Sequence, residues 1–428
     1  MSQGLRIGVA GLGTVGGGVV RLLASQADIL EQRCGRRLEL AAVSALEHDP
    51  ELDLSAPRWF DDALALAADP EIDVVVELIG GADGIAKTVA EAAIANGKSL
   101  VTANKALIAH HGLELARAAE AAGVELCFEA AVAGGIPIIK ALREGLAGNR
   151  LSRVYGILNG TCNYILTEMQ ESGRNFAGVL QEAQALGYAE ADPSFDVDGV
   201  DAAHKLAILT SVAFGCPADL GAVHVEGIRE ISAIDIAYAA EFGYRIKLLA
   251  IAAKTERGIE QRVHPCLVAK NAPIAHVDGV FNAVVAEGDF IDQAIFEGHG
   301  AGRGPTASAV VSDLVDIARD NRLPAFGVPL ENLVAHPLAT MADHVCEYYV
   351  RLMVLDQPGV MADIAAILRD ESVSIESVVQ RGRAPGDVVP LIIITHDARE
   401  AVMGRVLGKF GQLEVVIEPP CLIRIETL

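Results

Sequence analysis

The spacing of apolar and polar positions divides the first third of the chain into alternating strands and helices. Short apolar runs rich in β-branched residues predict strands, and between them apolar positions recur with helical spacing. The predicted strands are 5–10, 38–43, 73–78, 99–102 and 124–128, and the clearest helical stretches are 19–30, 88–96 and 113–122. Strands that alternate with helices indicate an α/β fold with a Rossmann-type doubly wound parallel sheet.

Beyond residue 150 the pattern changes to longer strands and helices. The stretch TASAVVSDLVDIARD (306–320) predicts an amphipathic helix, and a proline-containing connector follows it. Residues 348–425 predict the order strand, helix, strand, strand, helix, strand, with the last strand over 414–426. That βαββαβ order is ferredoxin-like. We therefore predict three domains: 1–135 with about 305–345, a central α+β domain over 136–304, and a C-terminal domain over 346–428.

Composition and charge limit the possible partners and compartment. The net charge of −23 disfavours binding to nucleic acid or anionic lipid. No stretch reaches the roughly 18 uncharged apolar residues of a membrane span, and no charged segment precedes an apolar run at the N-terminus. The seven cysteines are scattered and form no CxxC pair, which favours a reducing cytoplasm and argues against a zinc site.

A glycine fingerprint directly follows the first predicted strand. Gly11, Gly13 and Gly16 form GxGxxG at the start of a helix, where bare backbone can approach a pyrophosphate. A glycine-rich turn without a ligand is the alternative, but the alternating sheet favours dinucleotide binding. The second strand ends in VSALEH, without the acidic residue typical of NAD sites or the arginine typical of NADP sites. The choice between the two nucleotides therefore stays open.

Charged residues mark a candidate catalytic centre. Lys105 follows the carboxyl end of a predicted strand, where doubly wound sheets bind ligands, although a solvated lysine is an equal alternative. Asp201 and Lys205 lie four residues apart near the start of a helix and share one face. An exposed ion pair is the alternative, but this helix continues LAILTSVAF and is too apolar to be exposed. A buried lysine beside a carboxylate is a candidate acid–base group.

Glycines also mark two further turns. Gly187 is expected to end the helix predicted over 178–186. Gly300, Gly302 and Gly304 precede a helix, where the backbone either closes over a cofactor or forms a plain loop.

Motifs along nearly the whole chain resemble one enzyme family, homoserine dehydrogenase. They are GLGTVG, VVELIGG, VTANKALIAHHG, FEAAVAGGIPIIKAL, GILNGTCNYIL and ALGYAEADPSFDVDGVDAAHKLAIL. The tail, with DQPGVMADIA and SVSIESVVQ, is similar to an ACT regulatory domain. The block DPSFDVDGVDAAHK is specific to the family, whereas the glycine fingerprint is not. The resemblance implies a monofunctional cytoplasmic enzyme of threonine, methionine and isoleucine biosynthesis, which interconverts L-homoserine and L-aspartate 4-semialdehyde with NADP or NAD.

The resemblance also implies roles for individual residues. Lys205 exchanges a proton with the substrate oxygen, and Asp201 holds the substrate and orients that lysine. Lys105 lies between nicotinamide and substrate and is a second candidate for proton transfer. Glu190 accepts hydrogen bonds from the substrate amino group, and Asp196 lines the same pocket.

Cofactor, cation and regulatory positions follow from the same resemblance. The implied cofactor set is Gly11, Leu12, Gly13, Thr14, Val15, Gly16, Lys105, Gly187 and Gly302. A monovalent cation, Na⁺ or K⁺, is implied at Glu129 and the carbonyl oxygens of Val132, Gly134 and Ile136, because oxygen-only ligation suits a hard cation. Leu46 stands where many NADP-using members carry arginine. The central domain is implied to mediate catalysis and assembly into a homodimer or homotetramer.

Two other classes and one further role for the tail are weighed against this interpretation. A hydroxy-acid dehydrogenase with an ACT tail would lack the DVDGVDAAHK block, and a non-catalytic amino-acid sensor would show no turnover. The ACT domain is expected to bind threonine near Gly359 as a feedback effector, and a purely oligomerising role is the alternative.

Overall fold

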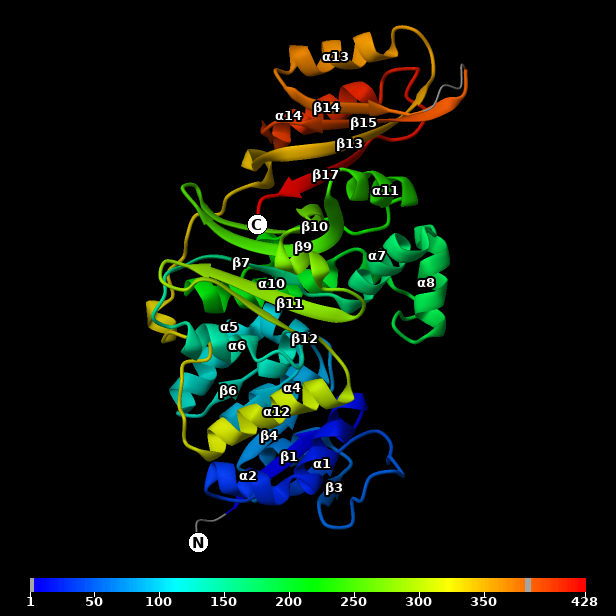
Figure 1. The fold of residues 1–428 in the computed structure, drawn as a ribbon. Helices are drawn as coiled ribbons and strands as arrows, with labels where there is room; N and C mark the ends of the chain where they lie inside the picture. The colour runs from blue at the N-terminus through cyan, green and yellow to red at the C-terminus, as the bar shows by residue number, and fades with distance from the viewer. Residues whose placement is uncertain (1–3, 382–385) are drawn as a thin grey trace.

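The computed structural model describes residues 4–381 and 386–428, so the first three residues of the predicted N-terminal domain lie outside it. The described residues form two sheets, one of six strands and one of eleven (Figure 1). They contain no helix that is both long enough and apolar enough to cross a bilayer.

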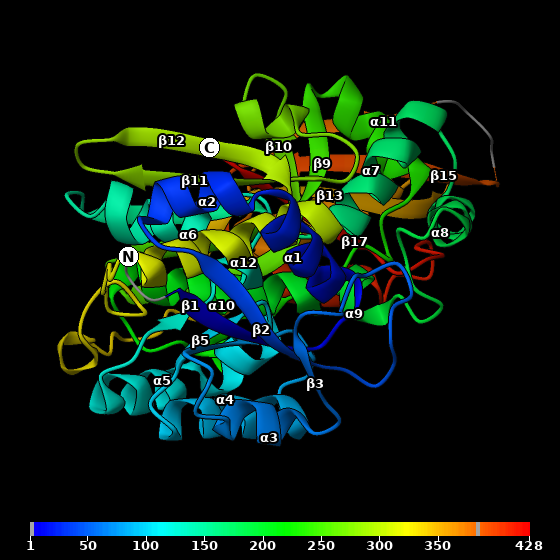
Figure 2. The same cartoon turned by 90° about the horizontal axis from the view of Figure 1, so that it is seen from below.

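The first sheet is parallel and doubly wound, as the sequence pattern predicts. Its strands, in the order β3-β2-β1-β4-β5-β6, are β1 (Leu5–Ala10), β2 (Leu38–Ser44), β3 (Arg58–Phe60), β4 (Val74–Glu77), β5 (Ser99–Thr102) and β6 (Leu126–Cys127). Its helices are α1 (Thr14–Ser25), α2 (Ala27–Cys34), α3 (Ala63–Ala68), α4 (Ile85–Ala95) and α5 (Lys105–Ala122). Figure 2 shows α3, α4 and α5 along one face of this sheet and α1 and α2 along the other.

A helix from later in the chain completes the second face of this sheet. α12 (Arg303–Ala318) packs against α1, and a Cβ on Gly18 would lie 2.7 Å from the carbonyl oxygen of Arg303. Its apolar residues Val310 and Leu314 are fully buried in the same core as Val19. The helix predicted over 306–320 is therefore confirmed, with a start three residues earlier.

The second sheet begins with long antiparallel strands. They are β7 (Leu151–Ile157), β9 (Tyr244–Thr255), β10 (Gly258–Ala269), β11 (Phe281–Gly288) and β12 (Asp292–His299), with β8 (His224–Val225) beside β10. The accompanying helices are α6 (Ile138–Lys140), α7 (Gly160–Ser172), α8 (Phe176–Ala185), α9 (Ser194–Val197), α10 (Val200–Phe214) and α11 (Ala233–Glu241). Short helical turns occur at η1 (Glu129–Ala131), η2 (Ala141–Gly145), η3 (Leu220–Ala222), η4 (Pro273–His276), η5 (Leu330–Asn332) and η6 (Met341–Asp343).

Helix α10 joins the two sheets. It packs against α5 on one side and against β7, β9 and β10 on the other (Figure 1), and nearly all of its residues are buried. The apolar run LAILTSVAF thus lies in the core, as the sequence predicts, and the polar residues in the first turns of α10 lie between the sheets.

The C-terminal segment has the predicted ferredoxin-like fold. Its elements are β13 (Val345–Leu355), α13 (Val360–Asp370), β14 (Ile375–Gln380), β15 (Val388–Thr395), β16 (Ala398–Arg399), α14 (Glu400–Phe410) and β17 (Cys421–Glu426). The strand predicted over 414–426 is wrong in its first half, because Pro419 and Pro420 lack the hydrogen-bond donors of a ladder strand. β17 also pairs with β10 in parallel, which makes one continuous sheet through the central and C-terminal parts.

Candidate active site

The glycine turn after β1 has the geometry of a phosphate site. Gly11 has a φ of +103°, and a Cβ on Gly16 would lie 2.0 Å from the carbonyl oxygen of Gly11. Helix α1 has no side-chain cap at Gly13 and no acidic residue in its first turn. Its first N–H groups therefore carry the positive end of the helix dipole without a competing side chain. The turn fits the pyrophosphate of a dinucleotide.

Three other positions implied for the cofactor belong to this turn and the start of α1, and two lie in later segments of the chain. Leu12 is buried, Thr14 is exposed and Val15 is half-buried. Gly302 has a φ of +112° and precedes α12, the helix that packs on α1. Gly187 has a φ of +77° and follows the last turn of α8, as predicted.

The end of β2 does not select between the two nucleotides. Ser44 is buried at the end of the strand and Leu46 is fully exposed after it. Beyond them the exposed His48 ring stacks on Trp59 with 3.6 Å between the ring centroids. Neither an acidic side chain at the strand end nor an arginine in the position of Leu46 is present.

Lys105 is held at the carboxyl edge of the parallel sheet. It is the first residue of α5, and the side chain of Asn104 caps that helix by accepting a hydrogen bond from the amide of Leu107 at 3.0 Å. The amide nitrogen of Asn104 also donates to the carbonyl of Gly81 at 2.6 Å. These bonds fix the direction in which Lys105 leaves the helix, and its ammonium lies over the ring of Phe195, 5.5 Å from the centroid.

Two lysines from different helices, α5 and α10, meet at one buried carboxylate. Asp201, in the first turn of α10, is only 3% exposed. Its Oδ1 lies 2.8 Å from the Nζ of Lys105, and its Oδ2 lies 2.8 Å from the Nζ of Lys205. Lys205 also donates to the carbonyl of Leu158 at 2.7 Å. An ammonium has three N–H groups, so one of Lys205 is left over among the contacts of the described residues.

The electrostatics keep this carboxylate ionised. Burial alone would raise the pKa of Asp201, but the ammonium groups of Lys205 and Lys105 hold it well below its ordinary value. Asp196 differs, because burial raises the pKa of its carboxyl and the charge of Asp201 adds to the effect. The site therefore contains one firmly charged carboxylate and one that protonates more readily.

Asn159 is a site residue that the sequence analysis missed. Its amide nitrogen donates to Asp201 Oδ2 and to Asp196 Oδ1, both at 2.8 Å. Its oxygen caps α7 by accepting from the amide of Cys162 at 2.8 Å. An asparagine between a strand and a helix is a cap signal, and this signal in NGTCNYIL marks the residue.

Glu190 does not join this hydrogen-bonded cluster. Its loop after α8 projects into solvent and leaves the side chain exposed, and its backbone carbonyl accepts a hydrogen bond from Gln184. The turn that leads into α9 lies between Glu190 and Asp196 along the chain.

The residues implied for a cation lie near α12. Glu129 is buried, and its two oxygens accept from the backbone amides of Ile139 and Lys140 at 2.9 and 2.8 Å. Burial raises the pKa of Glu129 to about 7, with a contribution from the Asp313 charge.

The carbonyl oxygens implied as partners of Glu129 differ in whether they accept a hydrogen bond. Those of Val132 and Gly134 accept no hydrogen bond from the described part of the chain, whereas that of Ile136 accepts from Ile138 at 2.7 Å. A buried carboxylate and, three and five residues later in the chain, two carbonyl oxygens without hydrogen bonds are the kind of oxygen ligands that a hard cation takes.

A parallel dinucleotide-type sheet, a phosphate turn and a buried lysine–carboxylate cluster together define a nucleotide-dependent oxidoreductase. Comparison with protein families makes this specific. The models for homoserine dehydrogenase, for its NAD binding domain and for the ACT domain match residues 137–315, 11–129 and 348–415.

Individual relatives agree with the family models. The chain is 47% identical to the homoserine dehydrogenase of Pseudomonas aeruginosa and 45% identical to that of Neisseria gonorrhoeae, each over 431 residues and 99% of both chains. The solved homoserine dehydrogenase of Thiobacillus denitrificans superposes with a TM-score of 0.94 at 45% identity, covering 99% of this chain and 98% of that one. The chain therefore belongs to the homoserine dehydrogenase family, and it is an oxidoreductase that requires a nicotinamide nucleotide.

Proposed function

We propose that Lys205 is the acid–base group in the interconversion of L-homoserine and L-aspartate 4-semialdehyde, and that Asp201 orients it. The observation that carries this proposal is the position of Asp201 between the ammonium groups of Lys105 and Lys205, at 2.8 Å from each. A nicotinamide nucleotide, when bound, exchanges the hydride. The protein must then hold the substrate and exchange a proton with its oxygen.

Each residue of the cluster has a defined task in this proposal. Lys205 directs its remaining N–H at the substrate oxygen, while Asp201 and the Leu158 carbonyl fix the other two N–H groups. Lys105 extends from the edge of the nucleotide-binding sheet and donates to the same substrate. Asp196 and Glu190 offer carboxylates to the substrate ammonium group. The developing alkoxide is thus met by positive charge in a site of low dielectric.

Turnover of L-homoserine with each nucleotide tests the activity and the preference left open at Leu46. We expect homoserine-dependent reduction of NADP or NAD by the purified protein at mildly alkaline pH. One relative has been solved with the reduced form of NADP: a hyperthermophilic archaeal homoserine dehydrogenase in complex with NADPH. It is 27% identical to this chain with a TM-score of 0.64, and the match covers 76% of this chain and all of that one. No turnover with either nucleotide, in folded protein, would contradict the proposal and favour an amino-acid sensor.

The same homoserine-dependent assay tests whether activity depends on a monovalent cation. We place Na⁺ or K⁺ at Glu129 and the carbonyls of Val132, Gly134 and Ile136, and the burial of Glu129 and the two carbonyl oxygens without hydrogen bonds support this placement. Replacing both ions with tetramethylammonium, which is too large for such a site, should lower activity. Equal activity with Na⁺ or K⁺ and with tetramethylammonium would contradict this assignment.

We further propose that the ACT domain binds threonine as a feedback effector at the N-terminus of α13. Gly359 precedes this helix with a φ of +101° and has open space where a side chain would stand. Gly359→Val should fill that space and also strain the turn, because a φ of +101° disfavours an L side chain. Both effects should raise the threonine concentration for half-inhibition at least about tenfold, a loss of about 1.4 kcal/mol in binding, with kcat unchanged.

The control for this variant is Gly408→Ala on α14, where a Cβ also meets open space. Equal threonine sensitivity in Gly359→Val and wild type would favour the oligomerising role. A point variant is preferable to deletion of residues 346–428, because deletion would also remove the strand that pairs with β10.

A further inference from the structure

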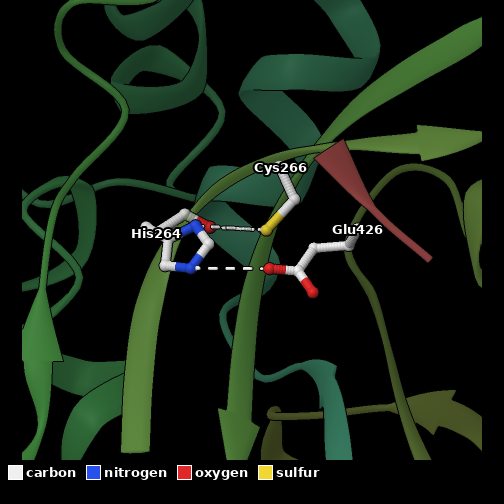
Figure 3. Close-up of side chains that lie close together, drawn as sticks. All are labelled: His264, Cys266 and Glu426. Carbon is white, nitrogen blue, oxygen red and sulfur yellow. Dashed lines mark hydrogen bonds and ion pairs between the residues drawn. The ribbon is translucent and has the colours of Figure 1, made fainter. Parts of the chain in front are cut away.

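A buried histidine and a half-buried one point at one carboxylate oxygen where the C-terminal strand meets the central sheet. Figure 3 shows His264 on β10 facing Glu426 at the end of β17. The Nε2 of His264 lies 3.8 Å from Glu426 Oε1, and the Nε2 of His344 lies 3.9 Å from the same oxygen. Neither nitrogen has a hydrogen-bond partner among the described residues.

Hydrogen bonds on the other ring nitrogens leave these two nitrogens as ligand atoms. The Nδ1 of His264 lies 3.0 Å from the carbonyl of Pro265, and the Nδ1 of His344 lies 3.1 Å from a carboxylate oxygen of Glu260. Glu260 accepts, so the Nδ1 of His344 donates. The Nδ1 of His264 also lies 3.3 Å from the Sγ of Cys266, and because that thiol donates to the His264 carbonyl at 3.3 Å, the ring N–H is left to donate to Pro265. In a neutral imidazole the other nitrogen then carries a free lone pair. This arrangement, with one ring nitrogen held by an acceptor, is usual for histidines that bind metals.

The distances are too long for hydrogen bonds and right for a bridging cation. An N–H···O bond spans about 2.7–3.2 Å. Zinc bonds to nitrogen and oxygen are about 2.0–2.2 Å, so two ligand atoms lie about 3.4 Å apart at the tetrahedral angle and about 4.2 Å apart when opposed. The separations of 3.8 and 3.9 Å fall within that range.

A thiol supplies a third ligand to the pair of His264 and Glu426. Cys266 is fully buried on β10, and one ligand atom each of His264, Cys266 and Glu426 lies within 4.8 Å of the others. A mixed set of nitrogen, sulfur and oxygen suits a borderline divalent cation such as Zn²⁺. Binding would release the thiol proton to solvent, because the thiolate is the form that ligates.

Carboxylates outnumber guanidinium groups in the ion pairs around the site. Arg262 donates to both oxygens of Glu426 at 2.8 Å and also pairs with Glu260. Arg424 pairs with Glu226 and Glu400. In these contacts four carboxylates face two guanidinium groups. The bond to Arg262 leaves lone pairs on Glu426 for a metal, since an ionised carboxylate offers about four acceptor sites.

We propose that His264, Cys266 and Glu426 bind a divalent cation of the Zn²⁺ class beside His344, and that this cation fastens the C-terminal strand to the central sheet. The site is separate from the lysine–carboxylate cluster, and its three ligands come from β10 and β17. The absence of a CxxC pair predicts that the chain has no zinc site. The ligand spacing here arises only when β17 pairs with β10.

Binding of Co²⁺ to the full-length chain tests the proposal, since tetrahedral Co²⁺ with a thiolate ligand gives a charge-transfer absorption. After chelator treatment we expect one equivalent of Co²⁺ to bind with that absorption, Zn²⁺ to displace it, and Zn²⁺ to raise Tm. Cys266→Ala should abolish the absorption. His264→Ala should weaken affinity by more than the ~10- to 100-fold typical of losing an outer partner.

Matched variants separate this site from other metal binding. Cys421→Ala removes a different buried thiol, which lies on β17, and should leave the absorption and the affinity unchanged. His396→Ala disrupts the more exposed group of Glu347, Glu376 and His396, and it should also leave them unchanged. No bound metal, or binding lost in His396→Ala and kept in Cys266→Ala, would overturn the proposal.

Discussion

Replacing Lys205 with alanine is expected to lower kcat by about 10²- to 10⁴-fold while nucleotide binding survives. The ammonium of Lys205 is held by Asp201 and the Leu158 carbonyl and has one remaining N–H for the substrate. Alanine removes both the proton donor and the positive charge next to the developing alkoxide. The nucleotide site is built from the glycine turn of the other sheet, so the nucleotide dissociation constant should change little.

Steady-state kinetics and nucleotide titration together check this result. Lys247→Met is the matched control, because Lys247 is also a buried lysine of the central sheet, where it bonds to Asn163 and Asp278 and lies outside the proposed site. The control should lower stability and leave kcat near the wild-type value. Unchanged turnover in Lys205→Ala, with a large loss in Lys105→Ala, would move the acid–base role to Lys105.

Replacing Asp201 with asparagine is expected to reduce both stability and activity. The change keeps the shape of the side chain and leaves the ammonium of Lys205 buried without a counter-charge. Breaking a buried ion pair from one side typically costs 3–5 kcal/mol. We expect about 3 kcal/mol here, the lower end, because the Lys105 side chain is 34% exposed and can turn to water. Loss of the oriented lysine should also lower kcat by about 10²-fold.

The pH dependence of this stability difference follows from the depressed pKa of Asp201. A carboxylate whose pKa is lower in the folded than in the unfolded protein stabilises the fold above its unfolded value, 3.8, and loses that contribution as pH falls through the folded value. Urea unfolding should therefore show the same gap between wild type and Asp201→Asn at pH 6 and pH 8, and a smaller gap in acid.

Asp196→Asn provides the comparison for this charge effect. Burial raises the pKa of Asp196, so its charge contributes less to the folded state, and the variant should lose less stability than Asp201→Asn. Equal stability of Asp201→Asn and wild type at pH 7 would show that the carboxylate is not the counter-charge of the two lysines.

Local patterns in the sequence determined the elements of the fold and part of the site. Apolar spacing predicted the parallel sheet, the helix at 306–320 and the ferredoxin-like tail, because burial on one face of a helix or strand leaves a period in the chain. The pair of Asp201 and Lys205 was also predictable, since one helical turn brings them together. The glycine turn was predictable because its backbone geometry excludes side chains.

Contacts between distant segments were decided by the tertiary structure alone. Lys105 reaches Asp201 from α5, the helix that follows β5 of the parallel sheet. Asn159, just after β7, bridges the carboxylates of Asp196 and Asp201. His264 meets Glu426 only because β17 adds to β10. No local period encodes such meetings, because they depend on how whole elements pack and in which register strands pair. The chain specifies its helices and strands residue by residue, whereas the packing of these elements decides which charges share a site.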